Sequence, residues 1–161
     1  MSSSSDRRLD PVTVQWLGRV GYRPQATDDG LLVTDGELRW RISKDEQAFA
    51  VDFAERGDAY SRRVEAQHFE DVERWLMLTT SPDVRMARGQ YTPAGPSEEE
   101  MAPGFSLRLE GRDRLVVDGS GHERIRLVNV GDRVGAAVAF THLADLPLAA
   151  VPARLDSETP R

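Results

Sequence analysis

Apolar and polar residues alternate along three short stretches in the first half of the chain, and this period of two predicts β-strands. The stretches are 31–34, 37–43 and 49–53. Asp35-Gly36, between the first two, is typical of a type I′ hairpin turn. We therefore predict a three-stranded antiparallel meander whose apolar face includes Leu38, Trp40, Ile42, Phe49, Val51 and Phe53.

The period changes to that of an α-helix in two places. Residues 67–79 carry one apolar stripe, and carboxylates in their early turns suit the helix dipole. Nearer the start, Asp10 before Pro11 is a helix-start signal, and the pattern continues to Gly21. The predicted stripes are Phe69, Val72, Leu76 and Thr79 in the longer helix, and Val14, Leu17 and Val20 in the shorter one.

A connection rich in proline and glycine follows at 80–104, with one predicted helical turn at 98–101. Its length exceeds what compact domains usually contain without a functional role. Alternation then resumes in three runs at 105–109, 115–117 and 125–127, which predict a second meander. Turns at Gly111 to Asp113 and at Gly119-Ser120-Gly121 separate these runs.

The last third ends in helices. Residues 134–146 are apolar and rich in alanine, which favours a buried helix, and Pro147 begins a shorter helix that Pro152 should end or kink. We predict an α+β fold: a single domain with an antiparallel sheet of about six strands in two meanders and helices packed on one face. The domain should span 9–155, between disordered tails at 1–8 and 156–161.

Length, charge and cysteine content limit the classes of function that the chain could have. The 161 residues suit one domain. The 27 acidic and 21 basic residues give a net charge of −6, which opposes binding to nucleic acid or to an anionic membrane. No cysteine is present, so disulfides and thiolate metal sites are excluded. No secretory signal or run of 18 apolar residues occurs, so we expect a cytoplasmic protein.

Motifs for catalysis are missing from the sequence. It contains no H-E-x-x-H, G-x-S-x-G or P-loop pattern. His68 with Asp71, and His142 with Asp145, could each offer two metal ligands on a helix. A solvated face for His68 and Asp71, and a place at a helix end for His142, explain these pairs better. We therefore expect no enzyme activity, no catalytic residue, no cofactor, no metal and no small-molecule substrate.

Arginine is the most informative residue type, since 20 of the 21 basic residues are arginines. Strand alternation places several of them on the polar face of the sheet, where acids such as Glu37, Asp52 and Glu110 could simply balance them. The alternative is a protein-binding face, because arginine and aromatic residues dominate interface hot spots. The candidates are Arg39, Arg41, Arg108, Arg124 and Arg126 on the sheet, with Arg85, Arg88 and Tyr91 in the long connection.

The order of short segments resembles a known family. The segments are VQWLGRVGY at 14–22, DGELRW at 35–40, FEDVERW at 69–75, MAPGF at 101–105 and THL at 141–143. Together they are similar to an actinobacterial immunity-protein family that includes the immunity factor for a secreted necrotizing NAD⁺ glycohydrolase toxin. Members usually carry more aromatics after the helix, where this chain has Leu76, Met77 and Leu78.

This resemblance implies a protein that binds a cognate secreted toxin, encoded beside it, and blocks the toxin's active site in the producer's cytosol. Such a protein needs no catalytic residues. An adaptor or chaperone for a secreted substrate protein is the alternative, and a hydrolase using aspartate or histidine is a third interpretation.

Overall fold

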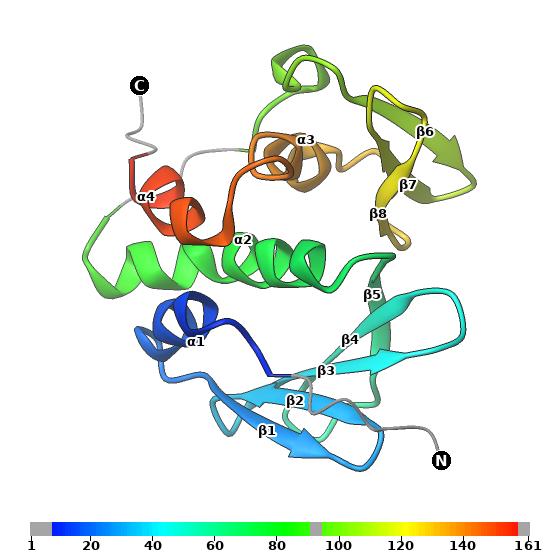
Figure 1. Ribbon diagram of the computed structural model, residues 1–161. Helices are drawn as coiled ribbons and strands as arrows, with labels where there is room; N and C mark the ends of the chain where they lie inside the picture. Colours follow the sequence, from blue (N-terminus) through cyan, green and yellow to red (C-terminus); the bar gives the residue numbers. More distant parts are fainter. Residues whose placement is uncertain (1–7, 91–94, 158–161) are drawn as a thin grey trace.

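The computed structural model describes residues 8–90 and 95–157 of the chain. It contains one eight-stranded antiparallel sheet and four α-helices, all in a single domain (Figure 1). The strands are β1 (Arg23–Thr27), β2 (Gly30–Thr34), β3 (Leu38–Lys44), β4 (Phe49–Glu55), β5 (Ser61–Ala66), β6 (Ser106–Glu110), β7 (Asp113–Val117) and β8 (Glu123–Leu127). The helices are α1 (Pro11–Gly18), α2 (Phe69–Ala87), α3 (Gly135–Thr141) and α4 (Val151–Asp156), with 3₁₀ turns η1 (Glu98–Glu100) and η2 (Leu148–Ala150).

The sheet runs in the order β1-β2-β3-β4-β5-β8-β7-β6. Two meanders are present as predicted, but the first has five strands, so the prediction of about six strands in total was wrong. β1 was missed because four of its five residues are exposed, which leaves no apolar alternation to detect. β5 was missed because it buries only Val64 and Ala66. β5 joins the second meander through the Val64↔Leu127 and Ala66↔Ile125 pairs.

The turn between β2 and β3 also differs from the prediction. A type I′ turn needs positive φ at both central residues, but only Gly36 has one, at 101°. Asp35 instead accepts hydrogen bonds from the backbone N–H groups of Glu37 and Leu38 at 2.9 and 2.7 Å. The loop is therefore longer than two residues and is held by an aspartate side chain.

The central helix α2 continues to Ala87, although Pro82 led us to predict its end at Thr79. Proline has no N–H, so the carbonyl of Leu78 loses its usual helical partner. The hydroxyl of Ser81 donates to that carbonyl at 2.7 Å. The start of the predicted 80–104 connection is consequently helix up to Ala87, and its later part contains the η1 turn, which a Ser97–Glu100 capping box begins.

The other helices follow their start signals closely. The Asp10 side chain accepts from Val12 N at 2.9 Å and begins α1, as predicted. Val14 of the expected apolar stripe is 36% exposed, and Trp16 lies in the core in its place. Pro152 occupies the first turn of α4, where proline is tolerated, so it neither ends nor kinks that helix. Asp156, which we placed in a tail, is the last residue of α4.

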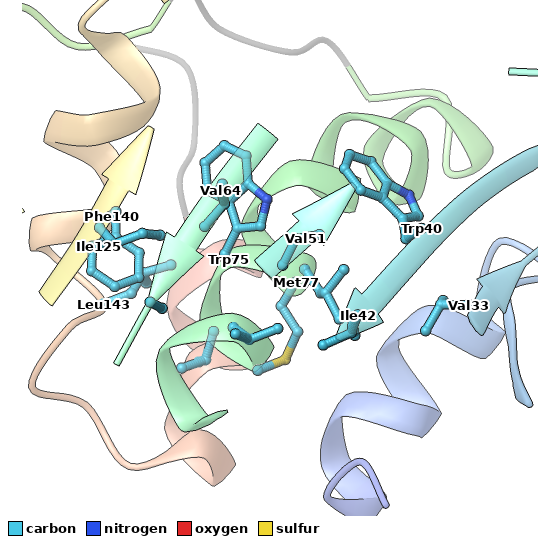
Figure 2. Packing of buried hydrophobic residues seen from close by; sticks show 14 of the residues in the cluster. Val33, Trp40, Ile42, Val51, Val64, Trp75, Met77, Ile125, Phe140 and Leu143 are labelled. Carbon is cyan, nitrogen blue, oxygen red and sulfur yellow. The ribbon is translucent and has the colours of Figure 1, made fainter. Parts of the chain in front are cut away.

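The core lies between the sheet and the helices, with α2 at its centre (Figure 1). Helices α1, α3 and α4 pack against α2, and α3 also contacts β7. Side chains from both meanders lie in this layer together with Met77 of α2, among them Val33, Ile42, Val51, Val64 and Ile125 (Figure 2). In the described part of the chain, no helix has the length and apolar character needed to cross a membrane.

Candidate protein-binding surface

The face of the sheet away from the helices, here called the outer face, carries a continuous chain of ion pairs. Asp52 of β4 accepts from Nη2 of Arg41 at 3.0 Å and from Nε of Arg62 at 2.6 Å. Arg62 also donates to Glu65 at 2.9 Å. Glu65 lies 3.9 Å from Nε of Arg126 in β8. The chain therefore crosses from the first meander into the second.

Arg126 is the centre of the second half of this network. It donates to Glu110 at 2.7 Å and to Asp113 at 3.1 Å. Arg108 of β6 lies 3.3 Å from both Glu110 and Glu123. Three predicted residues, Arg41, Arg108 and Arg126, are thus brought together on one face, and Asp52 and Glu110 pair with them, as expected if acids balance the arginines.

The ion pairs also set the charge state of these carboxylates. Asp52 is only 5% exposed. Burial raises the pKa of Asp52, but hydrogen bonds from Arg62 and Arg41 outweigh it, so the pKa lies below its ordinary value. A hydrogen bond from Arg126 lowers the pKa of Glu110 in the same way. Asp52 and Glu110 are therefore ionised at neutral pH, and the ion pairs hold the side chains of the outer face in place.

Arg39 and Arg41 share an aromatic partner that sequence analysis missed. Their guanidinium carbons lie 5.1 and 4.2 Å from the ring centroid of Tyr60, the residue before β5. Arg39 also donates to the backbone carbonyls of Arg56 and Asp58 at 2.6 and 3.2 Å. Arg39, Arg41 and Tyr60 form a preorganised group, here called the Tyr60 patch. Its signal in the sequence was an aromatic residue beside the unrecognised strand β5.

Arg124 does not share the outer face with Arg126, contrary to the prediction. The β7–β8 register shifts between Val116 and Val117, so Val116 pairs with Ile125 and Val117 pairs with Glu123. Arg124 is the extra residue of this bulge, and Glu123 takes its place beside Arg126. The bulge turns Arg124 toward α2, where its Nε and Nη2 donate to Asp71 at 3.0 and 3.1 Å.

Asp71 is the centre of a buried ion cluster. It is 0% exposed and also accepts from Arg74 at 2.8 Å. Both arginines bond the 144–146 segment: Arg124 donates to Ala144 O at 2.6 Å and Arg74 to Leu146 O at 2.8 Å. The cluster therefore fixes α2, β8 and the 144–146 segment after α3 to each other, and a polar hollow of about 520 Å³ opens beside it.

The ion cluster engages the aspartate of each histidine–aspartate pair that was considered as a metal-ligand pair. Asp71 is bonded to arginines, and Asp145 pairs with Arg124 at 2.9 Å. Nε2 of His142 lies 2.7 Å from the carbonyl of Glu100. Within the described ranges, no three histidine or acidic side chains gather in a way that could hold a metal ion.

Because the helix passes through Pro82, Arg85 lies on α2 and Arg88 is its C-cap residue, instead of both lying in a loop. Arg85 is 6% exposed and donates to Leu155 O at 2.6 Å. Arg88 pairs with Asp156 at 3.0 Å, and Arg19 of the α1 end pairs with the same carboxylate at 3.2 Å. These contacts attach α4 to α1 and α2. Tyr91 lies outside the described residues.

Comparison with known proteins agrees with this architecture. The chain shares its fold with a solved structure described as Rv3902c from M. tuberculosis, with a TM-score of 0.77 at 18% sequence identity over 97% of this chain and 93% of that one. No curated protein matches the sequence. A sequence model described as Immunity protein 61 matches residues 16–159, which include every described helix and strand except the start of α1. The chain therefore belongs to the Immunity protein 61 family.

Proposed function

We propose that this protein is an immunity protein that binds a cognate secreted toxin, an NAD⁺ glycohydrolase, and blocks its active site. The observation that carries the proposal is the family match over residues 16–159. A non-enzymatic role fits the geometry, since the ionisable residues of the outer face and of the Asp71 cluster are engaged with each other. A toxin expressed in the same cell would be bound in the cytosol, before it reaches NAD⁺.

The Tyr60 patch is the proposed centre of contact on the outer face. Arginine and tyrosine are typical hot-spot residues, and these side chains are already held in one geometry, which lowers the entropy lost on binding. Arg108 and Arg126 would form a polar rim around it, since their charges are already paired. Arg85 and Arg124 have little surface to offer a partner, so we assign them to holding the helices in place.

The test is an NAD⁺-hydrolysis assay with the C-terminal domain of the protein encoded beside this one. Titration with this chain should abolish hydrolysis at a 1:1 ratio if the active site is blocked. A Tyr60→Ala variant should require a higher concentration, and Arg154→Gln should not, because Arg154 is an exposed residue of α4, which packs on α2 on the opposite side of the sheet from the patch. Tight binding without inhibition would favour the adaptor or chaperone, and absence of binding would overturn the proposal.

A further inference from the structure

An apolar groove lies on the helix side of the sheet, near the end of β4 and the beginning of β5. Its walls come from β3, β4, α2, the 127–130 segment after β8 and the start of α3. Its volume is about 420 Å³, within the range of roughly 300–1,000 Å³ that is common for ligand sites. The apolar side chains along it are Trp40, Phe53, Trp75, Leu127, Val128 and Val130. A large apolar side chain would fit such a space.

Two arginines are the only charged residues lining this groove, and no acidic residue does so in the part of the chain that the structure describes. Arg63 lies with its guanidinium 5.3 Å from the Phe53 ring, and Arg133 donates weakly to Val130 O at 3.4 Å. Among the described residues, neither has a carboxylate within ion-pair distance. In a protein with a net charge of −6, a purely cationic groove favours an anionic occupant.

Besides the two arginines without carboxylate partners, Trp75 places an unsatisfied hydrogen-bond donor in the groove. Its ring lines the groove and is 7% exposed, yet its Nε1–H has no hydrogen-bond acceptor among the described atoms. A buried donor without a partner costs free energy, and an occupant that brings an oxygen acceptor could remove this cost. The groove therefore combines apolar walls, two unpaired cations and one unused donor.

We infer that this groove docks a segment of the toxin that carries a large apolar side chain next to a carboxylate. The inference rests on the proposed function. Apolar walls would hold the side chain, and Arg63 and Arg133 would pair with the carboxylate. The Tyr60 patch and the groove lie on opposite faces at the same end of β4 and β5, since Ser61 pairs with Phe53. One partner that wraps this end of the sheet could therefore contact both.

Binding of the toxin C-terminal domain tests the charge requirement. The double variant Arg63→Gln/Arg133→Gln should raise the dissociation constant at least about tenfold, because two charge pairs with the toxin are lost. Lys44→Gln/Arg154→Gln is the matched control: it removes the same charge from two exposed cations that lie outside the groove and the Tyr60 patch, and it should change the constant less than about twofold. Equal dissociation constants for the two variants would overturn the groove as a docking site while leaving the proposed function intact. No binding by the unmodified chain would overturn both.

A substitution inside the groove separates charge from shape. Ala136 is exposed on the first turn of α3 and lines the groove, so glutamate and glutamine are both compatible with folding there. The two side chains have nearly the same size, and thermal unfolding of each variant confirms its fold. Ala136→Glu should weaken toxin binding at least about fivefold more than Ala136→Gln, because the carboxylate repels an acidic occupant. Equal weakening of toxin binding by the two substitutions would overturn the inference that the docked segment is acidic. A dimer of the unmodified chain that Ala136→Glu dissociates would assign the groove to a second copy and overturn the inference.

Discussion

The outer face and the groove both present arginines, but in opposite states. On the outer face, Arg41 and Arg126 are each held by at least one carboxylate at about 3 Å. In the groove, Arg63 and Arg133 have no carboxylate partner among the described residues. A paired guanidinium already has its charge balanced and some of its donors used, whereas an unpaired one can gain its first charge pair from a partner. The difference teaches that arginines on two surfaces offer a partner different things: a preorganised, charge-balanced face on one side of the sheet and uncompensated positive charge in the groove.

The largest expected effect tests whether a paired arginine is structural. Asp71→Ala leaves Arg74 and Arg124 partly buried without their shared carboxylate and should lower the free energy of unfolding by about 3–5 kcal/mol. Urea denaturation measures this loss. Asp145→Ala removes the exposed partner of the same Arg124 and should cost less than about 1 kcal/mol. Similar losses for the two variants would contradict a structural role centred on Asp71.

The next effect concerns binding by the outer face. Tyr60→Ala removes the ring against which Arg39 and Arg41 are packed and should weaken toxin binding about tenfold, as hot-spot truncations commonly do. Arg108→Gln, at the rim of the same face, should change the dissociation constant less than about twofold. Isothermal titration calorimetry distinguishes the two. A larger effect of Arg108→Gln would place the centre of contact on the second meander instead.

A smaller effect follows from the pKa of Asp52, which lies below the ordinary value of 3.8. Its ionised form stabilises the fold above that value, and this contribution is lost as pH falls through the folded-state pKa. Asp52→Asn should therefore cost about 1 kcal/mol at pH 7, since both arginine partners are partly exposed. The difference from the unmodified chain should shrink on acidification below pH 3.8. A difference that persists at low pH would indicate lost packing instead of lost charge.

The smallest effect has the opposite sign. Glu73 is 3% exposed, and burial raises its pKa above 4.5 despite a hydrogen bond from Asp10 N. The ionised form therefore costs stability once pH rises through 4.5 and the folded-state pKa. Glu73→Gln should raise the melting temperature slightly at pH 7, and the gain should disappear below pH 4.5. A variant less stable than the unmodified chain at pH 7 would show that the charge of Glu73 strengthens the bond to Asp10.

Local signals in the sequence predicted much of the fold. Alternation located β3, β4 and the second meander, and Asp10-Pro11 located the start of α1. The same signals failed in two places, one decided by a side-chain hydrogen bond next to a proline and one by pairing with distant strands. Ser81 supplied the hydrogen bond that let α2 pass Pro82, and β5 became a strand because β4 and β8 pair with it on both sides.

The candidate surface was predicted only in part, for related reasons. Arg41 and Arg126 lie on the outer face because residues two apart in a strand share a side. Arg124 left that face because one bulge changes which residues lie on each side of the sheet. The groove had no local signal, since its walls come from segments as far apart as Trp40 and Ala136.

The sequence by itself determined the α+β class, the two meanders, the main helices and the family resemblance. These depend on periodicity and on short segments, which covalent geometry makes local properties of the chain. Only the tertiary structure decided which arginines are paired and which are free. Pairing depends on carboxylates brought close by strand register and helix packing, as with Arg124 and Asp71, which are 53 residues apart. Such distances along the chain carry no periodic signal, so the partners become visible only when the chain is folded.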